Sequence, residues 1–251
     1  MDTLVPALDR ISPSRRPASR LAGHQRWSDL LFVHWRLPAD VVAPLLPPEL
    51  SVDTWEGDAW VGLVPFRMSG VRPWWSPWGI AFLETNVRTY VHFRGRDPGV
   101  WFFSLDANHP AAVSVARARW RLNYCLAEMS VARQGDLFCY DSRRLGSAGE
   151  YSHVVARLTD ESVEPFEAQR GTLEHFLAER YLLYAGRSGK LWRGQVHHRP
   201  YLLQPAELVE SEESLLAANR VDVRQPPCHV LYSRHVDVEV FPLIPVARDL
   251  W

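Results

Sequence analysis

Five side chains that could bind or protonate a small molecule alternate with apolar residues in one short segment of this chain. They are Glu84, Asn86, Arg88, Tyr90 and His92. Because successive side chains of a strand point to opposite faces, an extended backbone places all five on one face. An arginine binds a carboxylate through two parallel hydrogen bonds, and glutamate and histidine carry protons.

Two interpretations of this face remain open. If it lines an enclosed cavity, Arg88 binds an acidic group, Asn86 and Tyr90 contact the ligand, and Glu84 and His92 transfer protons. If it faces water, the segment is an exposed strand with a pair between Glu84 and Arg88. The apolar surroundings favour the cavity, because an exposed strand would be flanked by more polar residues.

A second candidate group lies where the next apolar strand ends. Asp106 is followed closely by Asn108, His109 and Pro110. An aspartate beside a histidine can orient the imidazole for acid–base work, so we include His109 among the catalytic candidates and Asp106 among the ligand contacts. The alternative, which the spacing favours, is that these side chains cap a helix that begins at Pro110.

The chain contains no convincing motif for a metal or a cofactor. His197 and His198 are adjacent, and neighbouring strand residues point to opposite faces, so the pair cannot easily chelate one ion. We assign His198 to the ligand-binding set, and we expect no metal and no cofactor. Cys125 and Cys139 fall in strands of a predicted hairpin, where core packing is the expected role.

Lysine chemistry has one candidate. Lys190 is the only lysine in the chain, and it lies in a predicted turn between a helix and a strand. Turns are usually exposed, and an exposed amine is a weak nucleophile at neutral pH.

The overall composition limits the classes of function. The chain has 251 residues, 47% of them hydrophobic, and a net charge of −1, so no basic surface favours nucleic acid. No apolar run approaches the length of a membrane span. Three scattered cysteines indicate reduced thiols and a cytoplasmic location. We expect a small acidic or aromatic ligand as partner, and an oligomer is compatible with the sequence.

The pattern of elements predicts one α+β domain with a large, mostly antiparallel sheet. Residues 1–22 are rich in proline, serine and arginine and are expected to be a poorly ordered lead-in to a single domain over 23–251. Strands are predicted over 26–37, 83–93, 100–107, 124–133, 137–144, 151–158, 190–198, 200–209 and 229–241, with a hairpin around 56–58. Helices are predicted over 39–46, 109–121, 172–185 and 212–218. Three tryptophans, at 74, 75 and 78, either form an exposed apolar lip or partner contact or fold back onto the sheet.

Five separated motifs resemble one known family. They read F-V-H-W-R-L-P with L-L-P-P-E-L, then E-T-N-V-R-T-Y-V, F-F-S-L-D-A and R-G-Q-V-H-H-R-P. In this order they resemble the YqjF-like family, a bacterial group of undetermined function placed in the acetoacetate decarboxylase-like fold. The resemblance covers about residues 24–245. It implies a closed or cone-shaped double β-barrel with a few peripheral helices and a pocket in its middle.

The resemblance also implies what the chain lacks. The enzyme that names the fold attacks a β-keto acid with a lysine activated by a second lysine, whose charge lowers the pKa of the first. That pair follows a proline just after a central strand, where this chain has Ala111 and Ala112. The carboxylate-binding arginine of that enzyme corresponds roughly to Ser28, with Arg26 nearby. We therefore expect acid–base chemistry on an organic acid or carbonyl compound without a Schiff base, or alternatively a non-catalytic binding pocket or an interaction module that uses the tryptophans.

Overall fold

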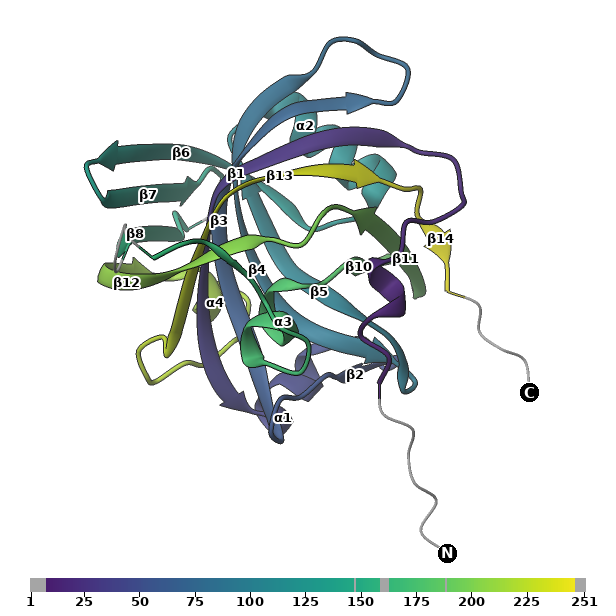
Figure 1. Ribbon diagram of the computed structural model, residues 1–251, viewed down its shortest axis with the longest axis horizontal. Helices are drawn as coiled ribbons and strands as arrows, with labels where there is room; N and C mark the ends of the chain where they lie inside the picture. Colours follow the sequence, from purple (N-terminus) through teal and green to yellow (C-terminus); the bar gives the residue numbers. More distant parts are fainter. Residues whose placement is uncertain (1–7, 147, 159–162, 188, 247–251) are drawn as a thin grey trace, which may run out of the picture.

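Strands dominate the computed structural model of this protein, which describes residues 8–146, 148–158, 163–187 and 189–246 (Figure 1). Runs of β-branched and aromatic residues with period-two alternation form them. The strands are β1 Gly23–Pro38, β2 Leu50–Val52, β3 Asp58–Pro73, β4 Ile80–Phe93, β5 Arg96–Ala107, β6 Tyr124–Gln134, β7 Leu137–Arg144, β8 Tyr151–Leu158, β9 Phe166–Glu167, β10 Leu182–Arg187, β11 Lys190–His197, β12 Leu202–Glu213, β13 His229–Val240 and β14 Ile244–Pro245.

In the described chain these strands form one hydrogen-bonded sheet. Its order is β14-β11-β10-β5-β6-β7-β8-β12-β13-β1-β3-β4-β2, with β9 on β12 and further pairings of β11 with β13 and of β5 with β4. Only the pairings of β5 with β10 and with β6 are parallel; the others are antiparallel. The predicted large, mostly antiparallel sheet is confirmed. Its closure into a double β-barrel stays a prediction.

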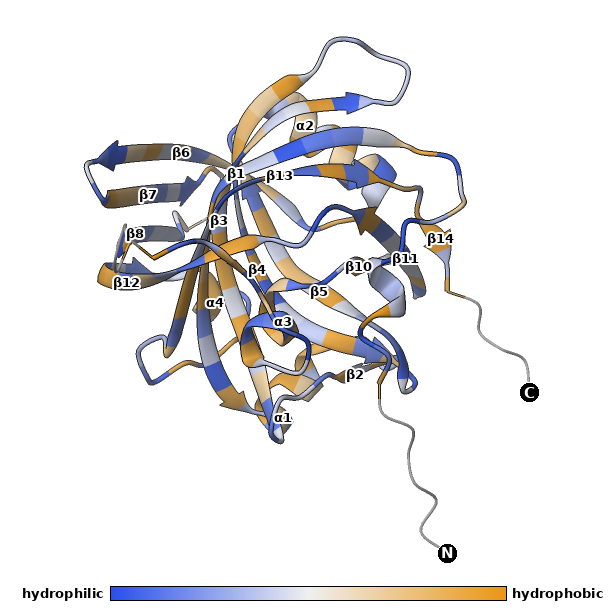
Figure 2. Ribbon diagram, viewed as in Figure 1, coloured by the Kyte–Doolittle hydropathy of each residue, from blue (hydrophilic) through white to orange (hydrophobic). Residues whose placement is uncertain are grey.

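The central strands β1, β3 and β4 bury both of their faces. One face packs toward β7, β8 and α4 (Leu215–Ala218). Its core includes Leu31, Val33, Leu63, Val87, Phe138, Tyr140, Val154 and Leu215. The opposite face packs on a second core that includes Phe32, Val64, Phe66, Tyr201, Leu203 and Val236. Hydrophilic residues are interspersed with hydrophobic ones along these strands (Figure 2), so a polar residue on either face is placed inside the protein.

The helices are short and lie at the periphery. They are α1 Ala39–Val42, α2 Pro110–Val115, α3 Leu173–Ala178 and α4, with 3₁₀ turns at Ser12–Ser14 and Ala43–Leu45 and a π-helical turn at Ala116–Trp120. Pro110 begins α2, and the His109 side chain caps it, as one alternative predicted. The predicted helix over 172–185 is wrong beyond Ala178. Its second half becomes β10, because sheet pairing with β11 and β5 outweighs the helical periodicity of the sequence there. The predicted helical turn over 212–218 is shorter than expected, because β12 continues to Glu213.

The expected lead-in over residues 1–22 falls partly outside the described residues, at 1–7. Residues 8–22 cross the sheet and contact it through several polar groups. Arg16 pairs with Glu239, Gln195 donates a hydrogen bond to the Pro13 carbonyl at 2.8 Å, and Arg10 pairs with Asp53. The single domain over 23–251 stays a prediction. No helix in the described ranges is long and apolar enough to cross a membrane.

The tryptophan segment after β3 faces solvent. Trp75 and Trp78 are 68% and 84% exposed, so of the two alternatives the one in which they fold back onto the sheet is excluded for these two. They lie in the turn between β3 and β4, which also contains Pro77. Trp74 is less exposed because the Arg20 guanidinium stacks on its ring at 4.1 Å.

Candidate functional site

The polar face of β4 lies inside the protein. Glu84, Asn86, Arg88 and Tyr90 alternate along the strand, and all four are buried. The solvent-exposed alternative is therefore excluded for them. They share the face that carries Phe32 of β1 and packs beneath α3, since the Arg88 guanidinium lies over the Phe32 ring at 5.4 Å and the Tyr90 ring contacts Phe176 at 5.3 Å. Their roles in binding or catalysis stay predictions.

Glu84 is poised to exchange a proton near neutral pH. The Tyr124 hydroxyl, at the start of β6, donates a hydrogen bond of 2.6 Å to its Oε2 atom. Burial raises the pKa of Glu84 to about 7, although the hydrogen bonds from Tyr124 and Asn86 oppose that rise. A carboxyl with this pKa is present in both protonation states at neutral pH, which is the property a general acid or base needs.

This pKa shift predicts how stability depends on pH. A carboxyl whose pKa is higher in the folded state than in the unfolded state stabilises the fold at low pH. This stabilisation is lost as the pH rises from the ordinary pKa of the carboxyl, 4.5, through its folded-state pKa of about 7. The lost stabilisation amounts to roughly 3 kcal/mol. Glu84→Gln should therefore gain stability relative to the wild type on going from pH 5 to pH 8, as measured by urea unfolding. Glu207→Gln, at an exposed carboxyl of β12, is the control that should show no such change. If the free energy of unfolding of Glu84→Gln differs from that of the wild type by the same amount at pH 5 and pH 8, the raised pKa of Glu84 is wrong.

Arg88 is a buried cation that has no carboxylate partner among the described residues. Its Nη2 atom donates hydrogen bonds to the Leu177 carbonyl at 3.2 Å and to the Tyr90 hydroxyl at 3.4 Å. Its Nε atom has no partner, and no carboxylate among the described residues forms an ion pair with it. Buried charges are normally paired, because an unpaired one is costly. An arginine kept in this state is suited to receive an anion.

Beside Arg88, Tyr90 and His34 of β1 form a hydrogen-bonded pair. His34 Nε2 lies 2.7 Å from the Tyr90 hydroxyl, which in turn donates to the Leu177 carbonyl at 2.9 Å. Because the single hydroxyl proton is used on Leu177, His34 must carry its proton on Nε2. Burial holds the pKa of His34 well below its usual value, with His229 and Arg88 adding to the effect. Its Nδ1 lone pair is buried and unpartnered.

Gly62 of β3 allows this arrangement. It pairs with both His34 and Arg88 across the sheet. A Cβ atom at Gly62 would lie 3.1 Å from the His34 ring and 3.6 Å from Arg88 Cγ. The absence of a side chain therefore lets the imidazole and the arginine approach each other from strands on either side of β3.

Several buried polar atoms on this face lack a protein partner. Within the described residues they include His34 Nδ1, Trp60 Nε1, Asn86 Oδ1, Arg88 Nε, His198 Nε2 and His229 Nδ1. Buried polar groups are usually satisfied by protein or by water. These buried donors and acceptors indicate a polar interior site for water or a ligand.

His198 lies at the edge of this group. Its ring stacks on Tyr181 at 4.6 Å and contacts Tyr201 at 4.7 Å, and Tyr201 packs against Phe32. Its Nδ1 atom contacts the Arg199 carbonyl at 2.7 Å, and burial lowers its pKa to about 4. A continuous series of rings thus joins a neutral His198 to the surroundings of Arg88.

Three predicted site residues lie apart from this group. Asp106 occupies the opposite face of the sheet, where it pairs with Arg144 at 2.9 Å and contacts Ser142. His109 accepts a hydrogen bond from the Ala112 N–H and packs on Phe82, so the structure does not form the Asp106–His109 pair. His92, eight residues beyond Glu84, accepts from the Gly95 N–H in the turn after β4.

The sequence analysis missed His34, Tyr124 and Gly62. His34 is a polar residue within an otherwise apolar run of β1, a signal that could have been used. Tyr124 and Gly62 carried no such signal, since their importance depends on which strands neighbour β4.

Comparison with known proteins assigns this chain to a family. The DUF2071 family, described as an uncharacterized conserved protein, matches residues 24–237. This chain belongs to that family. It is 36% identical over 222 residues to "Uncharacterized protein YqjF" of Bacillus subtilis (strain 168), a match that covers 87% of this chain and 90% of the relative. The YqjF-like resemblance drawn from the five motifs is confirmed.

Solved structures confirm the acetoacetate decarboxylase-like fold. Acetoacetate decarboxylase from Legionella pneumophila superposes with a TM-score of 0.63 at 15% identity, covering 94% of each chain. An acetoacetate decarboxylase-like enzyme from Sphingomonas wittichii RW1 gives 0.61 at 11% identity, covering 91% of this chain and 94% of the enzyme. The enduracididine biosynthesis enzyme MppR, complexed with pyruvate, gives 0.58 at 10% identity with 93% of each chain covered. At these identities the likeness establishes the fold alone.

Proposed function

We propose that this protein binds a small organic anion at Arg88 and that Glu84 transfers a proton to or from it, so that the protein is an enzyme acting on an organic acid or carbonyl compound. The buried Arg88 guanidinium, which has no carboxylate partner in the described chain, carries this proposal. A carboxylate ligand would supply the missing counter-charge through charge-assisted hydrogen bonds. Asn86 lies between Glu84 and Arg88 along β4, and Tyr90 lies beyond Arg88. We assign both as neutral side chains that contact the ligand.

The chemistry proposed here does not use a Schiff base. Ala111 and Ala112 occupy the first turn of α2, and neither offers a nucleophile. Lys190, the only lysine, is exposed at the start of β11. The named activity of the Legionella relative and the pyruvate bound by MppR support a small keto acid as the class of compound to try. A cytoplasmic location is part of the proposal, supported by three free cysteines.

A non-catalytic binding protein is the second candidate, and Glu84 separates it from the enzyme. A binding site needs Arg88 but has no use for a carboxyl whose pKa lies near 7, since such a group is ionised only in part at neutral pH. The exposed Trp75 and Trp78 favour a separate role in contacting a partner, which is compatible with either function.

Proton exchange tests the proposal directly. In deuterated water, the wild type should catalyse the exchange of the methyl hydrogens of pyruvate for deuterium. Proton NMR measures the rate of this exchange. Glu84→Gln should lower that rate about a hundredfold, the usual scale for loss of a general base. Glu207→Gln should not change it. Binding of pyruvate by both proteins without exchange by either would instead identify a non-catalytic binding protein.

Borohydride trapping checks the absence of a Schiff base. Acetoacetate or pyruvate followed by borohydride should add no mass to the wild type, because the one lysine of the sequence, Lys190, is exposed and is a weak nucleophile. A covalent adduct mapped to Lys190 by peptide mass spectrometry would overturn this part of the proposal.

A further inference from the structure

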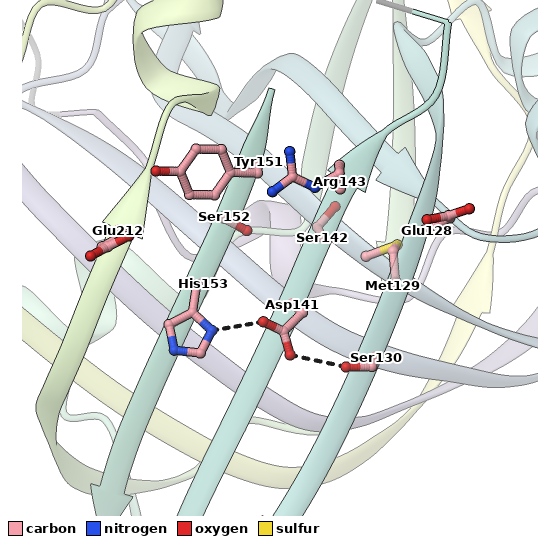
Figure 3. A pocket seen from close by; sticks show the side chains of 10 residues that line it. All are labelled: Glu128, Met129, Ser130, Asp141, Ser142, Arg143, Tyr151, Ser152, His153 and Glu212. Atoms are coloured by element: carbon pink, nitrogen blue, oxygen red, sulfur yellow. Dashed lines mark hydrogen bonds and ion pairs between the residues drawn. The ribbon is translucent and has the colours of Figure 1, made fainter. Parts of the chain in front are cut away.

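A second polar cluster lies on the outside of the sheet, away from Arg88 and Glu84. Side chains of β7 and β8 that point away from the core line an open groove of about 480 Å³ (Figure 3). Asp141 and His153 lie on its floor, on neighbouring strands in direct register. Cys139 lies two residues before Asp141 on the same face of β7. One ligand atom from each of these three residues lies within 4.8 Å of the others.

We propose that Cys139, Asp141 and His153 form a zinc-binding site. Thiolate, carboxylate and imidazole are the three side-chain ligands that zinc uses in proteins. The sequence spacing did not suggest the site, because the ligands converge through cross-strand pairing and not through a local motif.

The three side chains are close to the spacing that a tetrahedral ion needs, with one pair of ligand atoms closer together than zinc would hold them. His153 Nδ1 lies 2.7 Å from Asp141 Oδ1, and Cys139 Sγ lies 3.6 Å from Asp141 Oδ2. Zinc bonds of about 2.0–2.3 Å place neighbouring ligand atoms roughly 3.3–3.8 Å apart. Entry of the ion therefore replaces the Asp141–His153 hydrogen bond and requires only small side-chain rotations. Three protein ligands leave the fourth position for water or a groove ligand.

Outer groups hold the ligands in place. Glu210 of β12 lies 3.4 Å from His153 Nε2, the ring nitrogen that faces away from the proposed ion. Ser130 of β6 donates a hydrogen bond of 3.0 Å to Asp141. A carboxylate on the far nitrogen of a ligating histidine and a hydrogen bond to a ligating carboxylate are the usual supports of a metal site. Four strands thus contribute to one constellation.

The same geometry argues against a nucleophilic cysteine. Asp141 stands between Cys139 and His153, so the imidazole cannot take the thiol proton directly. Burial and the Asp141 carboxylate raise the pKa of Cys139, which keeps the thiol protonated in the absence of a metal.

Cobalt binding tests the proposal on the full chain after chelator treatment and in a non-thiol reductant. Co²⁺ should produce a thiolate-to-metal charge-transfer band that Zn²⁺ abolishes. Cys139→Ser should remove the band, whereas Cys228→Ser, at an exposed cysteine elsewhere, should keep it. Absence of the band in the wild type, or its loss in Cys228→Ser alone, would overturn the proposal.

Zinc affinity tests the other ligands. In competition with a chromophoric chelator, Asp141→Asn and His153→Gln should each weaken zinc binding more than tenfold, and Glu210→Gln about tenfold, as outer carboxylates usually do. Circular dichroism of the metal-free variants should match the wild type, because all the altered side chains are half-buried or exposed. Unchanged zinc affinity in His153→Gln would refute the site.

Discussion

Replacing Arg88 by alanine should lower the affinity of this protein for a small carboxylate about a hundredfold, the scale expected when a buried charged partner of an anion is removed. The buried guanidinium has an unpartnered Nε atom and no carboxylate partner in the described chain, so a bound anion would supply its counter-charge. The measurement is isothermal titration with acetate, pyruvate, acetoacetate and benzoate, which cover the acidic and aromatic ligands expected.

Arg26→Ala is the control for this variant. Arg26 of β1 pairs with Asp237 of β13, and both side chains are exposed, so its loss removes the same formal charge without touching the interior. Its affinity for the carboxylate should equal that of the wild type. An Arg88→Ala protein that binds as tightly as Arg26→Ala would remove Arg88 from the site.

Stability distinguishes a functional Arg88 from a structural one. A buried cation without a counter-charge destabilises the fold, so an apolar side chain of similar length should be tolerated or preferred. Arg88→Met should therefore keep or raise the free energy of unfolding, because Tyr90 still donates to the Leu177 carbonyl. A loss of binding without a loss of stability is the pattern expected of a residue retained for function.

The sequence predicted the strand that carries Glu84 and Arg88 because its alternation is strict. The alternation did not say which way the face points. That answer depends on Phe32 of β1 and Phe176 of α3 covering the polar face, and these contacts join segments far apart in the chain. The apolar neighbourhood was an indirect sign of the same burial.

Long-range pairing also explains what the sequence could not predict. The predicted helix over 172–185 has helical spacing to its end, but its last residues belong to β10, which pairs with β11 and β5, and only tertiary contacts could reveal this. Asp106 and His109 are three residues apart in the sequence, yet they do not meet. Asp106 pairs across the strands with Thr85 and not with Glu84, so its side chain lies on the other face of the sheet from the Glu84 side chain. Asp141 and His153 meet for the same kind of reason, because the register of β7 and β8 pairs them directly.

The site also depends on the position of α3, which supplies the Leu177 carbonyl to both Arg88 and Tyr90. Arg180, just beyond α3, donates a hydrogen bond of 2.6 Å to Asp53, whose backbone N–H bonds to the Tyr90 carbonyl. Both side chains are almost completely buried, and Arg10 pairs with the same carboxylate. Asp53 therefore joins α3 to the strand that carries the site.

Asp53→Asn should lower the free energy of unfolding by about 3–5 kcal/mol, because it leaves the buried Arg180 charge without its partner. Urea unfolding monitored by tryptophan fluorescence measures this change. The matched control is Asp237→Asn, which breaks an exposed pair with Arg26 and should cost about 1 kcal/mol or less.

The same variant connects stability to the site. If Asp53 holds α3 over β4, Asp53→Asn should also weaken carboxylate binding at temperatures where the protein remains folded, because the Leu177 carbonyl no longer orients Arg88. Equal losses of stability in Asp53→Asn and Asp237→Asn would show that the buried pair contributes no more than a surface pair. Normal binding by a folded Asp53→Asn protein would show that Arg88 is positioned by β4 and the Phe32 ring alone, independently of α3.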